Sequence, residues 1–303
     1  MLRSSILFTI VWLLLASGCA RVPSTGVTSL KSTTLSDLQG YLLNHKADLD
    51  QFRLRGPFAV TVQTNYELRL SATERFDTDL FLSASTGKAP LVILLHGYAS
   101  SKQDHTYQAM HLASWGMHSL VLQLPNTGPW VSNGKTLAKI VNFIYRSPEA
   151  IDSRIDANRI ILVGHSFGGS SVAIALAEHA RAAGGILLDP AGVGRELPRF
   201  LQQINSPVMV LGADARVSAT RNREYFYRFI RDGVAEVSIK DAAHEDAQYP
   251  SDSALSTEEL QITFVSVLTA TAFSLSSTGK FDYAWTSFSD AFENGKLFDA
   301  KKK

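Results

Sequence analysis

Continuous apolar runs recur along the chain from residue 90 onward, and segments with a helical pattern separate them. Such runs are typical of strands that are buried on both faces of a sheet. The runs are 90–97, 118–125, 159–166, 184–190 and 206–214, and the helical segments are 108–116, 136–146, 169–183 and 222–232. Strand alternating with helix predicts βαβ units, with a mainly parallel central sheet, helices on both faces and right-handed crossovers.

The chain before residue 90 is patterned differently. Leucines and a phenylalanine near helical spacing predict a helix over 36–53, with Ser36 as its N-cap. Three β-rich segments follow at 58–63, 66–72 and 78–83, and the second alternates apolar with polar residues. We expect these segments to form antiparallel edge strands on the N-terminal side of the sheet. At the other end, the aromatic stretch 281–298 predicts a helix packed on the body.

The N-terminus predicts export and a lipid anchor. One early charge, Arg3, precedes an apolar run over 6–16 that is short for a membrane span and fits a secretory signal peptide. Cys19 follows Ala-Ser-Gly, which resembles the lipobox of bacterial lipoproteins, although Leu15 lies one place too early. By that resemblance Ala20 favours the outer membrane, facing the periplasm. The alternative is an uncleaved anchor followed by an ordinary buried cysteine.

The predicted domain organisation has three parts. Residues 1–18 are the signal peptide, 19–35 are a Ser/Thr-rich tether, and 36–303 form a single domain. A chain of 303 residues with 45% hydrophobic side chains is long enough for one sizeable core. Because Cys19 is the only cysteine, no internal disulfide can support that core. No insertion between the predicted strands is long enough for a large lid.

Charge and composition exclude some classes of partner. The formal net charge is +1, and the only basic run is the terminal KKK, so nothing predicts binding to nucleic acid. His105, His111 and His118 have no metal-ligand spacing with carboxylates, and we expect no metal and no cofactor. The sequence leaves the oligomeric state open.

The stretch GHSFGG at 164–169 carries the strongest chemical signal. It contains Gly164-x-Ser166-x-Gly168 between a predicted strand and a predicted helix, the context of a nucleophile elbow. A side chain two residues before or after the serine would collide with neighbouring backbone, which explains the two glycines. The helix that follows directs its free amide hydrogens at the reacting centre. The alternative is a glycine-rich turn without chemistry.

A base and an acid must follow this serine along the chain. After Ser166 only His179 and His244 remain as histidines, and His179 lies inside the helix that the elbow begins. His244 lies in a loop between an alternating segment and the last long helix, where a general base is expected. Asp189 and Asp214 each end a predicted strand, and either could orient the imidazole.

Other residues complete the predicted site. The backbone amides of Tyr98 and Phe167 are the expected oxyanion-hole donors. Tyr98 could also line the acyl-binding side, and His105 could lie at the mouth of the cleft. Trp130 could be a substrate platform or a loop anchor. His96 is expected to order its loop, and His165 to pack behind the nucleophile.

The region from about 58 to 275 resembles the α/β-hydrolases that include platelet-activating-factor acetylhydrolases, chlorophyllases and bacterial cutinase-type polyester hydrolases. RGPFAV, LVILLHGYAS, IDSRIDANRIILVGHSFGG and the HE pair after residue 243 carry the resemblance. In the acetylhydrolases and chlorophyllases the acid follows the strand after the nucleophile, which implies Asp189. In the polyester hydrolases it lies one strand later, where this chain has Arg216, two residues beyond Asp214. The resemblance therefore favours Asp189.

The sequence thus predicts a serine hydrolase that cleaves carboxylic esters through an acyl-enzyme. A cleft without clustered charge would suit neutral, moderately apolar esters, whether small molecules or polymers. Two alternatives stay open. One is an acyltransferase or peptidase with the same triad, and the other is a non-catalytic envelope lipoprotein on a hydrolase scaffold.

Overall fold

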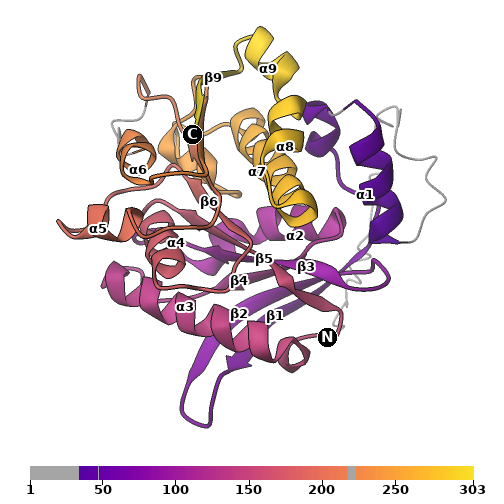
Figure 1. Cartoon of the computed structure of the whole chain (residues 1–303), viewed down its shortest axis with the longest axis vertical. Helices are drawn as coiled ribbons and strands as arrows, with labels where there is room; N and C mark the ends of the chain where they lie inside the picture. Colours follow the sequence, from indigo (N-terminus) through magenta and orange to yellow (C-terminus); the bar gives the residue numbers. More distant parts are fainter. Residues whose placement is uncertain (1–33, 47, 218–222) are drawn as a thin grey trace, which may run out of the picture. The chain divides into compact units, whose positions relative to one another are not determined.

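The structure is a computed structural model that describes residues 34–46, 48–217 and 223–303. Its nine strands form one sheet with the order β1-β2-β4-β3-β5-β6-β7-β8-β9 (Figure 1). The strands are β1 Val60–Arg69, β2 Arg75–Ser83, β3 Ala89–Leu95, β4 His118–Leu122, β5 Ile155–His165, β6 Gly184–Leu188, β7 Val208–Gly212, β8 Val234–Ile239 and β9 Leu297–Lys302. The predicted lipoprotein signal, Cys19 and almost all of the tether lie outside the described residues.

The central strands are parallel, as the apolar runs predicted. Strands β4, β3, β5, β6, β7 and β8 pair in parallel, and β1 and β2 pair antiparallel at the N-terminal edge. Strands β3, β4, β6 and β7 are buried along their whole length, and β5 is buried from Ile160 to His165. Both faces of these strands are therefore covered, which accounts for continuous rather than alternating hydrophobicity.

Helices cover both faces of this sheet, as expected for an α/β fold (Figure 1). The helices are α1 Leu35–Asn44, α2 Thr106–Ser114, α3 Trp130–Arg146, α4 Phe167–Ala177, α5 Leu197–Leu201, α6 Arg223–Phe229, α7 Glu258–Thr278, α8 Asp282–Ser287 and α9 Ser289–Glu293. Helices α3 to α6 share one hydrophobic core with alternate residues of the strands, while α2 and α7 lie side by side on the other face. Helix α7 is long and apolar enough to cross a membrane, but 83% of its most apolar window is buried, as in a core helix.

The N-terminal segments differ from the prediction in two places. The expected helix over 36–53 is instead α1, capped by Thr34 rather than Ser36, and a separate 3-10 turn over Leu49–Arg53. The helix ends because His45 is extended, and the Asp48 carboxylate caps the next turn. The first two β-rich segments are one strand, β1, because a bulge between Gln63 and Tyr66 lets pairing with β2 continue past the irregularity.

The C-terminal stretch also differs from the single helix expected over 281–298. It forms two short helices, α8 and α9, and then β9, which pairs antiparallel with β8 at the far edge of the sheet. Pairing with β8 was not visible locally, because a lysine-rich tail has the composition of a solvated surface segment. The lysines at 301–303 are part of this exposed edge, and charged edge strands resist pairing with other chains.

Candidate active site

The chain turns sharply between β5 and α4, and Ser166 lies at that turn. Its backbone angles are φ 54° and ψ −124°, a conformation that L-residues adopt only when the surrounding structure imposes it. A Cβ added at Gly164 would lie 2.4 Å from the Gly168 carbonyl oxygen, and one at Gly168 would lie 2.3 Å from that of His96. Both glycines are therefore required by close backbone packing, as the sequence predicted.

The loop after β8 brings His244 to the end of β6. The Nδ1 of His244 lies 2.5 Å from Oδ2 of Asp189, which is 1% exposed and has a positive φ of 35°. The other carboxylate oxygen accepts a 2.9 Å hydrogen bond from the amide of Ala213. When Nδ1–H donates to this carboxylate, Nε2 of His244 carries the lone pair and is free to accept a proton.

Ser166 and His244 line the same pocket, which has a volume of about 360 Å³. Its other lining residues include Tyr98 and His165, together with residues from the loop that follows His244. Within the described residues no hydrogen bond joins the Ser166 hydroxyl to the His244 ring. Catalytic hydrogen bonds are often long without substrate and shorten in the reacting complex, so this arrangement is compatible with a nucleophile and its base.

Asp214, at the end of β7, is not brought to His244. Its carboxylate forms a two-pronged ion pair with Arg216, with Nη2–Oδ2 and Nε–Oδ1 distances of 2.5 Å and 3.0 Å. It also accepts hydrogen bonds from the amides of Arg216 and Asp241. These donors, the Arg216 guanidinium above all, hold the pKa of Asp214 well below its usual range. Asp214 thus stabilises the loop that follows β7.

The backbone around the two expected oxyanion donors lies against Ser166. Phe167 is the first residue of α4, where amides have no partner within the helix. A Cβ added at Gly97 would lie only 2.8 Å from the Ser166 Cβ, so the loop that carries Tyr98 passes directly beside the serine. The Tyr98 ring is 58% exposed and meets Phe167 edge-on at 6.3 Å.

His96 orders this loop, as expected. It is buried, Nδ1 lies 3.0 Å from the Gly97 carbonyl oxygen, and Nε2 accepts a 3.1 Å hydrogen bond from the amide of Leu124. Burial lowers the pKa of His96, which favours the neutral ring that these bonds require.

His165 packs behind the nucleophile, where it also meets the predicted base. Its Nε2–H donates to the backbone carbonyl of His244 over 3.1 Å, and the two ring centroids are 4.5 Å apart. His165 is only 4% exposed, and this burial holds its pKa well below the ordinary value.

Two expected substrate contacts lie elsewhere. His105 is buried rather than at the mouth of the cleft; its Nδ1–H donates to Oε1 of Gln108, and its ring is 6.0 Å from that of His165. Burial lowers the pKa of His105 to about 4. Trp130 begins α3, is 9% exposed and packs on Phe167 at 5.4 Å, outside the residues that line the Ser166 pocket. Of the two interpretations of Trp130, the structure favours the anchor.

The structure adds a link between two loops that the sequence did not signal. Gln248 donates from Nε2 to the Ser100 hydroxyl over 2.6 Å, and that hydroxyl donates to Asp104 over 2.6 Å. The amide of Tyr249 donates to the Asp104 carbonyl over 2.9 Å. The loop that carries Tyr98 is thereby joined to the loop that carries His244. Partners this far apart in sequence leave no local pattern.

The charge of the pocket corrects a further expectation. Three carboxylates line it, from Asp104, Glu245 and Asp252, and none of its lining residues is a lysine or arginine. The cleft was expected to lack clustered charge. The sequence did not reveal the cluster because Asp104 lies on a different loop from the other two.

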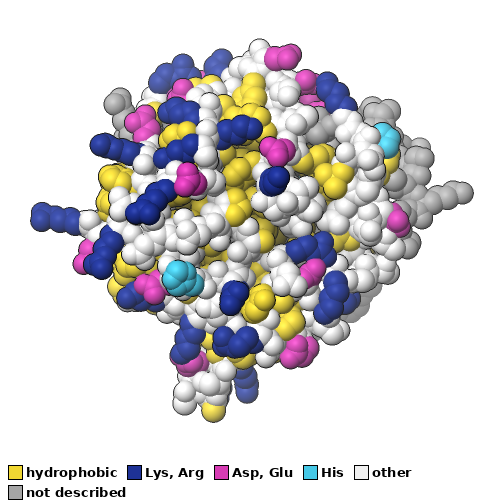
Figure 2. All heavy atoms as spheres, in the orientation of Figure 1, with side chains coloured by type: hydrophobic (Ala, Val, Ile, Leu, Met, Phe, Trp, Pro, Cys, Tyr) yellow, Lys and Arg dark blue, Asp and Glu magenta, His cyan; other side chains and the backbone are white. Residues whose placement is uncertain are grey.

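Among the described residues, no group of three or more His, Cys, Asp or Glu side chains could hold a metal ion. Basic and acidic side chains are interspersed on the face drawn in Figure 2, without a continuous basic stripe.

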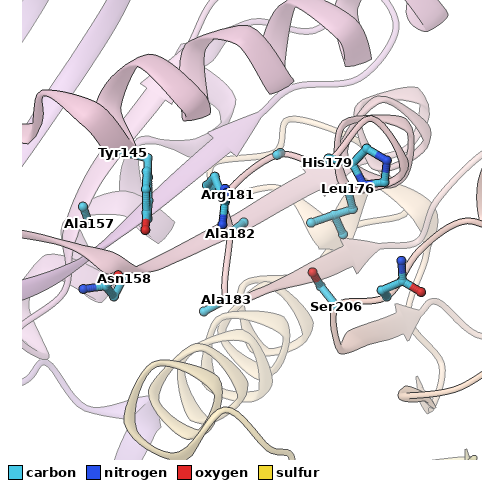
Figure 3. Close-up of a pocket in the computed structure, with 11 residues that line it drawn as sticks. Tyr145, Ala157, Asn158, Leu176, His179, Arg181, Ala182, Ala183 and Ser206 are labelled. Carbon is cyan, nitrogen blue, oxygen red and sulfur yellow. The ribbon is translucent and has the colours of Figure 1, made fainter.

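A larger pocket, of about 570 Å³, lies at the amino ends of the central strands, opposite the end that carries Ser166 (Figure 3). It is lined by the first part of β5, by the connection from α4 to β6 and by the chain before β7, with Tyr145, His179 and Arg181 among its residues. His179 lies just beyond the end of α4 and is exposed, so it is not brought to Ser166. The pocket that Ser166 lines is therefore not the larger of the two.

Comparison with known proteins supports the fold and the general class. A family model described as the alpha/beta hydrolase family matches residues 92–288, and none of the curated proteins compared with the chain matches it. The matched region runs from β3 to α8 and includes the elbow, Asp189 and His244. Since it spans more than half of the 303 residues, the chain belongs to the α/β-hydrolase family.

Proposed function

We propose that this protein is a serine hydrolase of carboxylic esters, with Ser166 as nucleophile, His244 as general base and Asp189 as the acid that orients it. The observation that carries the proposal is the 2.5 Å contact between His244 and Asp189 at a pocket that Ser166 also lines. A buried carboxylate on Nδ1 fixes the tautomer that leaves Nε2 as a base, and it stabilises the imidazolium once the proton is taken.

The reaction would proceed through an acyl-enzyme. His244 removes the proton of the Ser166 hydroxyl as its oxygen attacks the ester carbonyl carbon, and the amides of Phe167 and Tyr98 stabilise the oxyanion. The C–O bond to the alcohol breaks as His244 returns the proton to the leaving oxygen. Water, deprotonated by the same imidazole, then releases the acid and restores Ser166. These steps use side chains and amides of the chain, so the proposal includes no metal or organic cofactor.

The position of Asp189 supports the resemblance to the acetylhydrolases and chlorophyllases. It follows β6, the strand after the nucleophile, as in the acetylhydrolases and chlorophyllases. The polyester-hydrolase position one strand later holds Arg216, which is paired with Asp214. We therefore place the chain closer to the first arrangement.

A fluorophosphonate probe tests the nucleophile, since it labels only a serine activated by a base. We expect labelling of the wild type, and of Ser251→Ala as a matched control, because Ser251 lines the same pocket from the loop after His244. Ser166→Ala should lose both labelling and esterase activity. A folded wild-type protein that is never labelled would favour the non-catalytic alternative.

The acyltransferase and peptidase alternatives use the same triad and differ in the acceptor or in the bond that is cleaved. Product analysis in the presence of an added alcohol separates hydrolysis from transfer, and a peptide substrate tests the second possibility. We expect the free acid as the main product.

We also propose that Cys19 is lipidated and that the enzyme is anchored in the bacterial cell envelope, at the outer membrane facing the periplasm. The signal-like segment and the small residues before Cys19 support this. Cys19→Ser should abolish incorporation of labelled palmitate and release the protein from membranes. Unchanged processing and membrane association in that variant would contradict the proposal.

A further inference from the structure

The charged residues of the Ser166 pocket all have the same sign. Asp104 is contributed by the loop after β3, while Glu245 and Asp252 are contributed by the loop after β8. A wall with a single sign of charge attracts ligands of the opposite sign and repels ligands of its own.

No described cation neutralises these carboxylates. Among the described residues, none of the three forms an ion pair with lysine, arginine or histidine. Lys102, two residues before Asp104, is buried and already paired with Asp77 and Asp79 at 2.8 Å and 2.7 Å. Asp104 itself accepts hydrogen bonds from the Ser100 hydroxyl and the Ser101 amide, which hold the carboxylate in place without cancelling its charge.

A second, independent feature of the pocket points to a ligand of the same chemistry. His165 lines the pocket and is 4% exposed, and its Nδ1 has no hydrogen-bond partner. Because Nε2–H donates to the His244 carbonyl, Nδ1 carries a lone pair and can only accept. Buried acceptors without a partner are uncommon, so this one, on a residue that lines the same pocket as the three carboxylates, favours an electropositive or donor ligand.

The position of the carboxylates indicates which half of an ester they would meet. His244 must protonate the leaving alcohol, so the alcohol portion lies on the His244 side of the pocket. Glu245 is the next residue in the chain, and Asp252 is on the same loop. The exposed Tyr98 also lines this pocket, and its ring offers a π face that can bind a cation.

We infer that the enzyme prefers carboxylic esters whose alcohol portion carries an ammonium group, which Asp104, Glu245 and Asp252 recognise beside Ser166. This inference rests on the proposed esterase function and narrows its substrate class. Anionic esters of the same size are disfavoured, because they would bring like charges together inside the pocket.

A pair of isosteric thioesters tests the preference. Acetylthiocholine carries a quaternary ammonium group, and S-(3,3-dimethylbutyl) thioacetate replaces that nitrogen by carbon; both release a thiol that a coloured reagent measures. We expect kcat/KM for the cationic thioester to exceed that for the neutral one by about tenfold or more at low salt. The ratio should fall toward one when ionic strength rises from about 0.01 M to about 1 M, which shortens the screening length from about 30 Å to about 3 Å.

Variants assign the effect to the pocket. The double variant Glu245→Gln, Asp252→Asn should reduce the cationic-to-neutral ratio at least fivefold, whereas Glu149→Gln, an exposed carboxylate outside this pocket, should leave it unchanged. Turnover of the neutral thioester reports that each variant is folded.

The outcomes separate the two proposals. Hydrolysis of both thioesters at equal rates, or a ratio that the double variant does not change, overturns the charge preference and leaves the esterase standing. A wild type that hydrolyses neither thioester and is not labelled at Ser166 overturns the esterase itself.

Discussion

Two buried aspartates end neighbouring parallel strands, and the contrast between them shows what determines the role of a carboxylate. Asp189 follows β6 and Asp214 lies just beyond β7, and each is 1% exposed. Asp189 faces the imidazole of His244, whereas Asp214 is held by the guanidinium of Arg216. Residue type and burial are the same, so the partner decides the role: Asp189 receives one from a distant loop, and Asp214 receives one from its own loop.

The partners differ in what they allow. A guanidinium stays protonated at all accessible pH values, so the Asp214–Arg216 ion pair persists as long as the carboxylate is ionised, and it fixes its loop. An imidazole can gain and lose a proton, and a carboxylate beside it stabilises the charged form as it appears. Only the β6 aspartate is therefore suited to a reaction cycle.

The largest effect should come from removing the charge at the end of β6. We expect Asp189→Asn to reduce kcat on an ester by roughly 10⁴-fold, because an amide at this position favours the wrong imidazole tautomer. Steady-state kinetics on a chromogenic ester measures this. The matched variant Asp214→Asn should remain within about threefold of wild type, a change of about 0.7 kcal/mol in the barrier. The opposite pattern would identify Asp214, which follows β7, as the acid of the triad.

The parallel strands and the elbow could be predicted from the sequence, because both depend on local patterns. Continuous apolar runs reflect burial on both faces, and Gly164 and Gly168 reflect backbone contacts within one turn. The choice between Asp189 and Asp214 required a family resemblance, since both end a strand in the same way. It becomes visible in the structure through contacts with residues distant in sequence.

Other features escaped the sequence for the same reason. Strand β9 exists because β8 offers an open edge, which a lysine-rich tail does not reveal. The buried Lys102 pairs with aspartates on β2, and Gln248 reaches Ser100 from the far side of the pocket. The acidic wall likewise forms only when two loops meet. Each of these depends on pairing between segments rather than on periodicity.

Removing the β7 aspartate should affect stability rather than turnover. Asp214→Ala leaves the amides of Arg216 and Asp241 without their acceptor. We expect Tm to fall by roughly 3–10 °C, since an unsatisfied buried donor costs about 1–3 kcal/mol and each kcal/mol shifts Tm by about 2–4 °C in domains of up to about 250 residues. Differential scanning calorimetry measures this, and an unchanged Tm would contradict a stabilising role for the Asp214–Arg216 pair.

The pH dependence of stability follows from the lowered pKa of Asp214. A carboxylate whose folded pKa is depressed stabilises the fold at pH values above its unfolded pKa, about 3.9, and that contribution is lost as pH falls toward the folded value. The Tm difference between wild type and Asp214→Asn should therefore be largest near neutral pH and narrow below about pH 4. A difference that widens on acidification would contradict this account of the ion pair.

The smallest effect concerns the contact that His165 makes with the backbone of the proposed base, His244. His165→Phe keeps a ring against His244 but loses the Nε2–H bond to the His244 carbonyl, so we expect kcat/KM to fall by about tenfold, the equivalent of about 1.4 kcal/mol. His111→Phe is the matched control, because His111 is also buried and its Nε2 also lies at hydrogen-bond distance, 2.8 Å, from a backbone carbonyl, that of Phe52. Since burial keeps His165 neutral, the acid limb of the wild-type pH–rate profile should titrate as a single proton, and it should do so in His165→Phe as well. A two-proton limb in the wild type that becomes a one-proton limb in the variant would show that His165 titrates alongside His244. His165 would then not be the neutral support for His244 that its burial predicts.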